Sequence, residues 1–338
     1  MTKERFRVNW AKKTCLTESD LSAAADLMKN GFSFQDALSI AETKENRQTV
    51  QAIQLELAQG KEGESILPQY LPKQAAGYFD GFVQYMSMKD TFTAVLAILH
   101  SEKKQKEELV KGMLYPSLLF IGVNAGVLLF NAFVFPVMMQ MMSSFSYQDT
   151  SLQIVQKAVS YTADTVLILL FISIIVIIAA LQKKNIVSTY HWIQQRKEDA
   201  LLVKFASADF IRFYLACMKR GIATKEALTI LKDLKQKPLV SEIASQLDAS
   251  LQEGMAFAEA AEKSTAESAL VRIFRIAVYA SNCEELMEGY MNMVSRRTEH
   301  EIAVYARIVQ MFSYSAVAAV IVSVYQVLLM PIQMMQTL

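Results

Sequence analysis

The sequence predicts an all-α integral membrane protein with two duplicated cytoplasmic helical bundles, of about six helices each, and three transmembrane helices. Three observations lead to this prediction. The chain contains three long uncharged apolar runs, its polar parts have helical periodicity with turn residues at helix-length intervals, and one motif occurs twice. Hydrophobic residues make up 53% of the 338 residues, which is high for a soluble protein of this size.

Residues 1–111 are predicted to form the first cytoplasmic bundle. An apolar helical face ends at Gly31, which suits a left-handed residue after a helix C-terminus. Ser33 is expected to cap the next helix with Asp36 as its capping-box partner, and a third helix is expected to stop at Gly60. Alternation of apolar and polar residues is not sustained here, so helices are favoured over strands.

The first 13 residues alternate basic with apolar side chains, among them Phe6, Val8 and Trp10. This pattern is compatible with an arm that docks on a surface or a partner and, more simply, with a solvated chain terminus.

Three apolar runs are each long enough to cross a hydrocarbon core of about 30 Å at a rise of about 1.5 Å per residue. The central run is predicted as a return helix, which brings the second bundle back to the side of the first. The predicted boundaries are residues 112–142 for transmembrane helix 1, 143–164 for a short external loop, 165–182 for transmembrane helix 2, 183–307 for cytoplasmic domain 2, and 308–338 for transmembrane helix 3 with a short external tail.

Basic residues set the predicted topology. They lie at Lys103 to Lys111 before the first run, at Lys183 and Lys184 after the second, and at Arg296 to Arg307 before the third. Because cytoplasmic loops are enriched in Lys and Arg, the N-terminus and both bundles of this multi-pass cell-membrane protein are expected in the cytoplasm, and the C-terminus outside.

The second polar domain repeats the first. LMKNGFSFQDALSI (residues 27–40) aligns without a gap to CMKRGIATKEALTI (residues 217–230). Two further matches follow in the same order, Leu57-x-x-Gly60 with Leu251-x-x-Gly254 and Ser87-x-x-Asp90 with Ser281-x-x-Glu284, each Ser expected to open a capping box. Several matches in one order predict an internal duplication.

The residue types that could carry out catalysis or bind a metal do not combine into a catalytic, cofactor-binding or metal-binding site. The chain lacks a GxxxxGK[ST] phosphate loop, so any nucleotide hydrolysis is expected from a partner. His100, His191 and His300 lack the carboxylate or cysteine spacing of a metal site. A net charge of +1 argues against a bulk electrostatic grip on nucleic acid. The cysteines form no CxxC pair and are expected to be reduced thiols: Cys15, Cys217 and Cys283.

Small residues at i, i+4 spacing mark possible helix-packing faces in two predicted spans. They are Gly122 and Gly126 in the first span, and Ser315 and Ala319 in the last. Contact with another span or subunit and chance occurrence are both compatible with this pattern. Asp, Glu, Lys and Arg are absent from the three predicted membrane spans, which is unusual for proton or ion transporters.

The repeated motif xMKxGxxxxxALxI, together with the order domain, span, span, domain, span, resembles the inner-membrane platform family of type II secretion and type IV pilus assembly systems (the GspF and PilC type). The resemblance covers about Ser19 to Leu338. The compact length and short N-terminal arm look most like the competence branch of that family in Gram-positive bacteria, which serves a DNA-uptake pseudopilus. The family's GE-x-x-G-x-L pattern is replaced here by MSMKDTF (residues 86–92) and ASNCEEL (residues 280–286), so no role of its glutamate is carried over.

The resemblance implies a non-enzymatic, cofactor-free platform that forms homo-oligomers. Its implied partners are a hexameric secretion ATPase in the cytoplasm, pilin-like or pseudopilin subunits in the membrane and other assembly proteins, without direct binding of nucleic acid. Two further interpretations remain open, a subunit of a membrane transporter and a membrane sensor. The short external loop of residues 143–164 disfavours the sensor, because a sensor normally needs an external domain.

Overall fold

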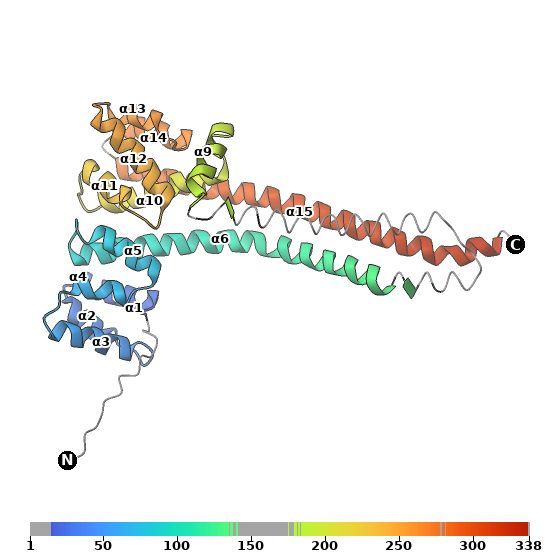
Figure 1. Cartoon of the computed structure of the whole chain (residues 1–338), viewed down its shortest axis with the longest axis horizontal. Coiled ribbons are helices and arrows are strands. Elements are labelled where there is room, and N and C mark those ends of the chain that lie inside the picture. Colours follow the sequence, from blue (N-terminus) through green and yellow to red (C-terminus); the bar gives the residue numbers. More distant parts are fainter. Residues whose placement is uncertain are drawn as a thin grey trace, which may run out of the picture. The chain divides into compact units, whose positions relative to one another are not determined.

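The computed structural model describes residues 15–134, 136–137, 140, 175, 179–180, 182, 184–277, 279–280 and 282–336. Every regular element among these residues is a helix, which confirms the all-α prediction for this part of the chain (Figure 1). The predicted external loop (143–164) lies outside the described residues. So does the predicted transmembrane helix 2 (165–182), apart from isolated positions.

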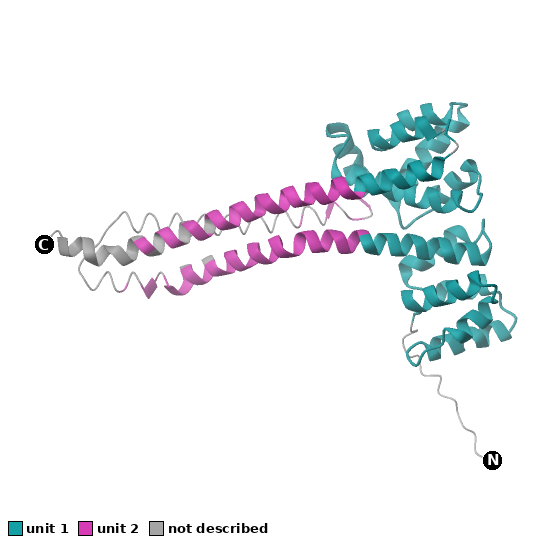
Figure 2. Cartoon of the chain, turned by 180° about the vertical axis from the view of Figure 1, so that it is seen from behind, with its two compact units in different colours: residues 1–104, 186–294 teal, residues 105–185, 295–338 magenta. Residues whose placement is uncertain are grey.

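The chain divides into two compact units (Figure 2). Unit 1 comprises residues 1–104 and 186–294, and unit 2 comprises residues 105–185 and 295–338. Both polar domains therefore contribute to unit 1. We call residues 18–104 the first bundle and residues 186–294 the second bundle. The domain boundaries given by the sequence remain predictions.

The first bundle begins with a capping box at Thr17. The Thr17 backbone N–H donates to Asp20 at 2.8 Å, and the Asp20 N–H donates to the Thr17 hydroxyl at 3.3 Å. Ser33 caps the second helix as predicted, accepting a hydrogen bond from the Asp36 N–H at 3.2 Å. The helices are α1 (Glu18–Lys29), α2 (Phe34–Ile40), α3 (Arg47–Ala58), α4 (Gly63–Ile66), the 3₁₀ turn η1 (Leu67–Gln69), α5 (Lys73–Phe82) and the start of α6 (Met88–Leu129).

In the described residues, the second bundle has six helices in an order like that of α1 to α6, preceded by one additional helix and without a counterpart of the 3₁₀ turn η1. Its helices are α9 (Ile186–Arg196), α10 (Leu201–Met218), α11 (Thr224–Lys232), α12 (Pro238–Gln252), α13 (Phe257–Lys263), α14 (Ser268–Ala277) and the start of α15 (Cys283–Gln336). Ser281, the predicted cap of α15, lies outside the described residues. The first backbone hydrogen bond at this helix start runs from Leu286 N–H to the Asn282 carbonyl at 3.2 Å, so Asn282 occupies the capping position.

Four glycines have positive φ in the described part of the chain, and they form two pairs at positions that match between the two polar domains. They are Gly31 (φ 94°), Gly60 (80°), Gly221 (73°) and Gly254 (85°). Each ends a helix in the same way. At Gly31, for example, the Phe32 N–H bonds to the Leu27 carbonyl at 3.2 Å and the Gly31 N–H to the Met28 carbonyl at 3.1 Å, the two bonds of a Schellman motif. The left-handed conformation explains why glycine stands at these positions.

Unit 2 contains the continuation of α6 and α15 beyond the bundles. Gly112 allows a close approach between the two helices, because a Cβ added there would lie 3.1 Å from Ile302 Cγ2. The α6 helix exposes large apolar side chains from Leu114 to Leu129, and the π-helical turn η2 (Phe130–Val134) follows it. Among the described helices, one stretch, Met88–Gly126, is long and apolar enough to cross a membrane.

Candidate functional site

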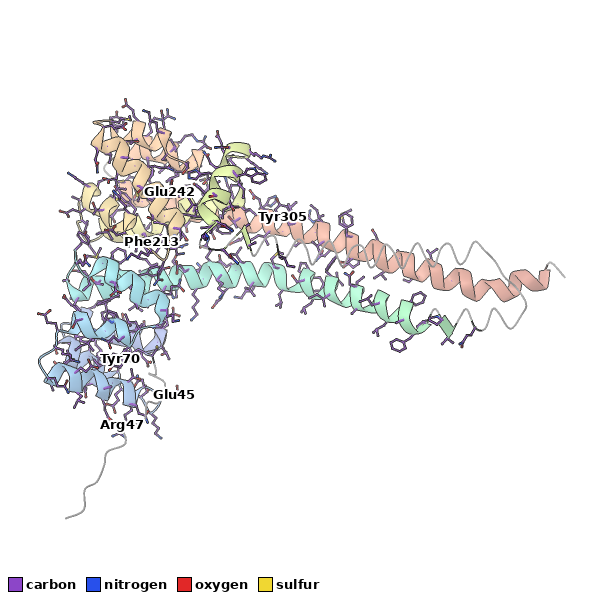
Figure 3. All side chains as sticks on the ribbon, viewed as in Figure 1. Glu45, Arg47, Tyr70, Phe213, Glu242 and Tyr305 are labelled. Atoms are coloured by element: carbon purple, nitrogen blue, oxygen red, sulfur yellow. The ribbon has the colours of Figure 1, made fainter. Side chains whose placement is uncertain are left out.

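The two bundles of unit 1 meet at a junction of apolar, aromatic and ionic contacts. Buried apolar residues of both bundles belong to one continuous core. Phe213, labelled in Figure 3, belongs to α10 and packs against α5. Its ring centroid lies 4.9 Å from that of Tyr78, edge to face, and 6.3 Å from that of Phe82, stacked. All three rings are buried. This aromatic contact joins the two halves of the unit.

Two glycines on α5 let the second bundle approach closely. A Cβ added at Gly77 would lie 1.8 Å from Gln236 Nε2, and one added at Gly81 would lie 3.1 Å from Leu234 Cδ2. Gln236 uses that space to donate from Nε2 to the Lys73 carbonyl at 2.7 Å. Gly77 and Gly81 therefore allow α5 to pack closely against the second bundle within unit 1. This i, i+4 pair lies in a polar domain, outside the apolar runs in which small-residue pairs are expected to mark packing faces, so the sequence did not single it out.

An ionic network crosses the junction beside the aromatic contact. Lys237 Nζ lies 2.6 Å from Glu102 Oε1 and 2.7 Å from Asp209 Oδ2, and Arg212 also pairs with Asp209. The Tyr78 hydroxyl donates to Glu102 at 3.0 Å. Burial alone would lower the pKa of Lys237, but the carboxylates of Asp209 and Glu102 raise it above its ordinary value. The lysine therefore stays charged in a largely buried position.

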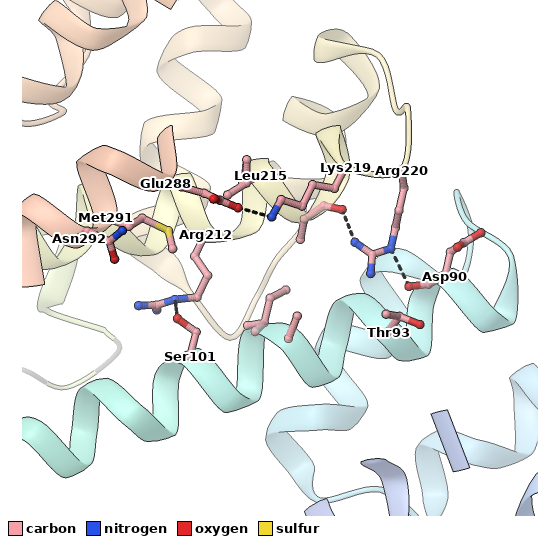
Figure 4. Close-up of a pocket in the computed structure, with 13 residues that line it drawn as sticks. Asp90, Thr93, Ser101, Arg212, Leu215, Lys219, Arg220, Glu288, Met291 and Asn292 are labelled. Atoms are coloured by element: carbon pink, nitrogen blue, oxygen red, sulfur yellow. Dashed lines mark hydrogen bonds and ion pairs between the residues drawn. The ribbon is translucent and has the colours of Figure 1, made fainter. Parts of the chain in front are cut away.

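A cleft of about 560 Å³ opens next to this network, between the start of α6, the end of α10 and the start of α15 (Figure 4). The Arg220 guanidinium spans it: Nε donates to the Asp90 carbonyl at 2.9 Å and Nη1 to the Ala216 carbonyl at 2.7 Å. Arg212 Nε donates to the Ser101 hydroxyl at 2.9 Å, and Lys219 pairs with Glu288. The bonds from Arg220 to Asp90 and from Arg212 to Ser101 join the two bundles across the cleft, whereas Lys219 and Glu288 both belong to the second bundle.

Groups suited to catalysis or metal binding do not gather in the described part of the chain. It contains no cluster of three or more His, Cys, Asp or Glu that could hold a metal ion. Burial raises the pKa of the Cys217 thiol to about 12. Burial, and then the nearby Glu284 carboxylate, raise that of Cys283. Both shifts disfavour the thiolate needed for nucleophilic chemistry. His191 Nε2 lies 3.2 Å from the Glu242 carboxylate, a paired surface position.

The packing residues predicted from the sequence lie in unit 2. Gly122 and Gly126 are exposed on α6, and a Cβ added at either would meet no atom within 4 Å. Ser315 is exposed on α15 and donates to the Met311 carbonyl at 2.9 Å. The side chain of Ala319 lies outside the described residues. A packing role for these four positions remains a prediction. A group that packs against Gly122 or Gly126 is not among the contacts that the structure describes.

Fold and junction together define a helical protein whose folded polar unit is fastened by structural contacts and continues into long helices, one of them apolar enough to span a membrane. Residues 210–331 match the family model described as type II secretion system (T2SS), protein F. The match runs from within α10 along most of α15. It supports a role in secretion or pilus assembly. The chain matches no curated protein sequence.

Proposed function

We propose that this protein is an inner-membrane platform of a pilus or pseudopilus assembly machine. In this proposal it transmits force from a cytoplasmic secretion ATPase to pilin-like subunits, which leave the bilayer and enter a growing filament. The observation that carries the proposal is the junction: two bundles are fastened into one compact unit from which α6 and α15 continue as long helices. We expect such a unit to move as one body, which a force-transmitting part requires.

The proposal includes an internal duplication with three membrane spans. The two polar domains share an order of elements and two pairs of positive-φ glycines at aligned positions. Both bundles lie in the cytoplasm in this topology. One apolar stretch, Met88–Gly126, supports the first span, and residues 165–182 and 308–338 would supply the others.

The proposed platform acts as a homo-oligomer without enzymatic activity or cofactor. The exposed pair Gly122 and Gly126 supports contact with a second copy, because small residues allow close helix approach in a membrane. The proposal assigns the platform to the competence branch that the sequence resembles, in which the filament serves DNA uptake and the platform itself does not bind DNA.

Gene deletion tests this function against a transporter role. We expect loss of surface filaments and of DNA uptake, with unchanged accumulation of small solutes. Complementation with the full chain restores both filament phenotypes, and complementation with the Lys237→Ala variant, whose junction is weakened, restores them poorly. Normal filaments with lost solute accumulation would reject the platform and favour the transporter subunit. A secretion ATPase gene and pilin-like genes are expected beside this gene.

A further inference from the structure

Unit 2 contains a groove of about 350 Å³ between α6 and α15, two helices that Figure 2 shows in magenta beyond the bundles. Residues 108–116 of α6 and residues 299–310 of α15 form its walls. Positions 112 and 308 are those at which the sequence predicts that transmembrane helices 1 and 3 begin. The groove therefore lies where both helices are expected to pass from the cytoplasm into the headgroup layer of the membrane.

Two carboxylates mark the end of the groove nearer to the bundles. The Ser295 hydroxyl lies 3.3 Å from Glu108 Oε2 and 3.5 Å from Glu299 Oε1. Because a hydroxyl carries one proton, it donates to one of these carboxylates at a time. Neither carboxylate has an ion-pair partner in the described part of the chain. Two negative charges that share a single donor favour an additional cation.

An unpaired hydroxyl lies between the two helices at the same end. Thr298 is on the face of α15 that carries Ser295 and Ile302, which are three positions before it and four after it. Ser295 contacts Glu108, and Ile302 Cγ2 would lie 3.1 Å from a Cβ added at Gly112, so this face is directed to α6. Thr298 is 5% exposed, and its hydroxyl has no hydrogen-bond partner among the described residues. A buried hydroxyl without a partner destabilises a protein, and a polar ligand would satisfy it.

An unpaired arginine marks the opposite end of the groove. Arg307 is exposed, has no hydrogen bond or ion pair in the described part of the chain, and is the last charged residue in the sequence. Tyr115 and Gln310 line the groove beside it. A guanidinium group matches the geometry of a phosphate, and tyrosine is common at the membrane–water interface. This end therefore suits a phosphate group.

We propose that the groove binds the headgroup of a phospholipid with a primary amine, of the phosphatidylethanolamine type. The phosphate pairs with Arg307, and the ammonium donates to Glu108 and Glu299. The acyl chains continue along exposed apolar side chains beyond the groove, among them Leu118 and Met311. This proposal rests on the part of the proposed function that places α6 and α15 in the membrane.

The arrangement of charges selects this headgroup over others. Glu299 and Arg307 are eight positions apart, about 12 Å along the helix axis. Their flexible side chains and the two methylenes between phosphate and ammonium cover this distance. A primary ammonium has three N–H donors, enough for two carboxylates and a hydroxyl. Phosphatidylcholine has no N–H donor, and phosphatidylglycerol has no cation to offset the carboxylates.

Native mass spectrometry of the full chain in detergent tests the site. The protein is titrated with phosphatidylethanolamine, phosphatidylglycerol or phosphatidylcholine that carry identical acyl chains. We expect the first phosphatidylethanolamine molecule per subunit to bind about tenfold more tightly than either of the others. Glycerophosphoethanolamine, the same headgroup without acyl chains, should not displace it at equal concentration.

Substitutions at the two ends of the groove should have different effects. Arg307→Gln should lower the affinity for phosphatidylethanolamine about tenfold, whereas Arg297→Gln, at an exposed arginine of α15 outside the groove, should leave it within about twofold. The double substitution Glu108→Gln and Glu299→Gln should also lower it about tenfold without weakening phosphatidylglycerol binding. Glu107→Gln, at an exposed neighbour outside the groove, is the matched control and should keep the preference.

Equal affinity for the three lipids would overturn the proposal, as would a preference for phosphatidylethanolamine that survives the double substitution. Equal losses in Arg307→Gln and Arg297→Gln would assign binding to general charge. Displacement by glycerophosphoethanolamine at equal concentration would reject a lipid as the ligand. Lipid binding is measured on purified protein, so it is separate from the deletion phenotypes. The lipid preference together with normal filaments in the deletion strain rejects the platform alone, and filament loss without the preference rejects this site alone.

Discussion

Lys237 of the second bundle forms an ion pair with Glu102 of the first, with 2.6 Å between Nζ and Oε1. Side chains of both residues are largely buried, at 22% and 12% exposure. The two residues are more than a hundred positions apart in the sequence. Their ion pair joins the second bundle to the first. Removal of one partner from such a pair leaves the other charge buried without compensation.

Lys237→Ala is therefore expected to lower the free energy of unfolding by about 2–4 kcal/mol. Thermal unfolding of the detergent-solubilised protein measures the change. Lys219→Ala is the matched control, because the Lys219 and Glu288 side chains are 44% and 48% exposed, and exposed ion pairs contribute at most about 1 kcal/mol. Equal destabilisation by the two substitutions would show that the network does not fasten the junction.

Gly77→Ala is expected to destabilise the protein by about 1–2 kcal/mol, although alanine favours helices. The added methyl would occupy the position of the Gln236 amide and break its hydrogen bond to the Lys73 carbonyl. Gly122→Ala, at an open helical position, should stabilise the helix by about 0.8–1 kcal/mol or have no effect. Chemical denaturation of both variants in the same detergent compares them. A stabilised Gly77→Ala protein would contradict the close approach.

Gly122→Leu and Gly126→Leu are expected to weaken self-association while leaving the folded subunit intact. Both glycines face open space within the described contacts, so bulky side chains create no clash inside one copy. They would prevent close approach of a second helix. Native electrophoresis measures the oligomer, and Ala at the same positions serves as the control that keeps a small face. Unchanged oligomers in both Leu variants would exclude this surface.

Alkaline pH should destabilise the protein through Tyr190. Burial raises the pKa of this tyrosine from 10.0 to about 12, with an opposing contribution from the Thr265 side chain and a further raising one from the Glu242 carboxylate. The folded state therefore holds this proton more tightly than the unfolded state, and the stabilisation is complete below pH 10 and is lost as pH rises toward 12.

Thermal midpoints measured between pH 9 and 12 test this dependence. Tyr190→Phe should lessen the alkaline decline, because it removes one of the buried hydroxyls whose pKa is raised; Tyr70, Tyr78 and Tyr290 keep theirs. Tyr279→Phe, at a side chain that is 88% exposed, should leave the decline as it is. A decline that is identical in the wild type and in Tyr190→Phe would assign it to other groups.

The sequence was informative where local chemistry determines structure. Gly31 and Gly60 end helices with positive φ, and Ser33 caps α2 through Asp36, all as predicted. The junction was not predictable in the same way. In the sequence alone, Gly77 is an ordinary helical glycine, and only the folded structure brings Gln236 against it. Glu102 lies in a charged stretch that the sequence predicts to be solvated, and only the folded structure pairs it with Lys237. Contacts between distant segments depend on tertiary packing, which periodicity and capping do not encode.

Membrane topology of the two bundles gives the most direct test of the central claim that they form one fastened unit. Single cysteines at exposed Lys61 and Lys263, in a chain whose native cysteines are replaced by alanine, are labelled with a membrane-impermeant maleimide in intact cells and in inverted membrane vesicles. Our account predicts that both positions react in inverted vesicles and neither reacts in intact cells. Labelling of the two positions from opposite sides of the membrane would contradict it.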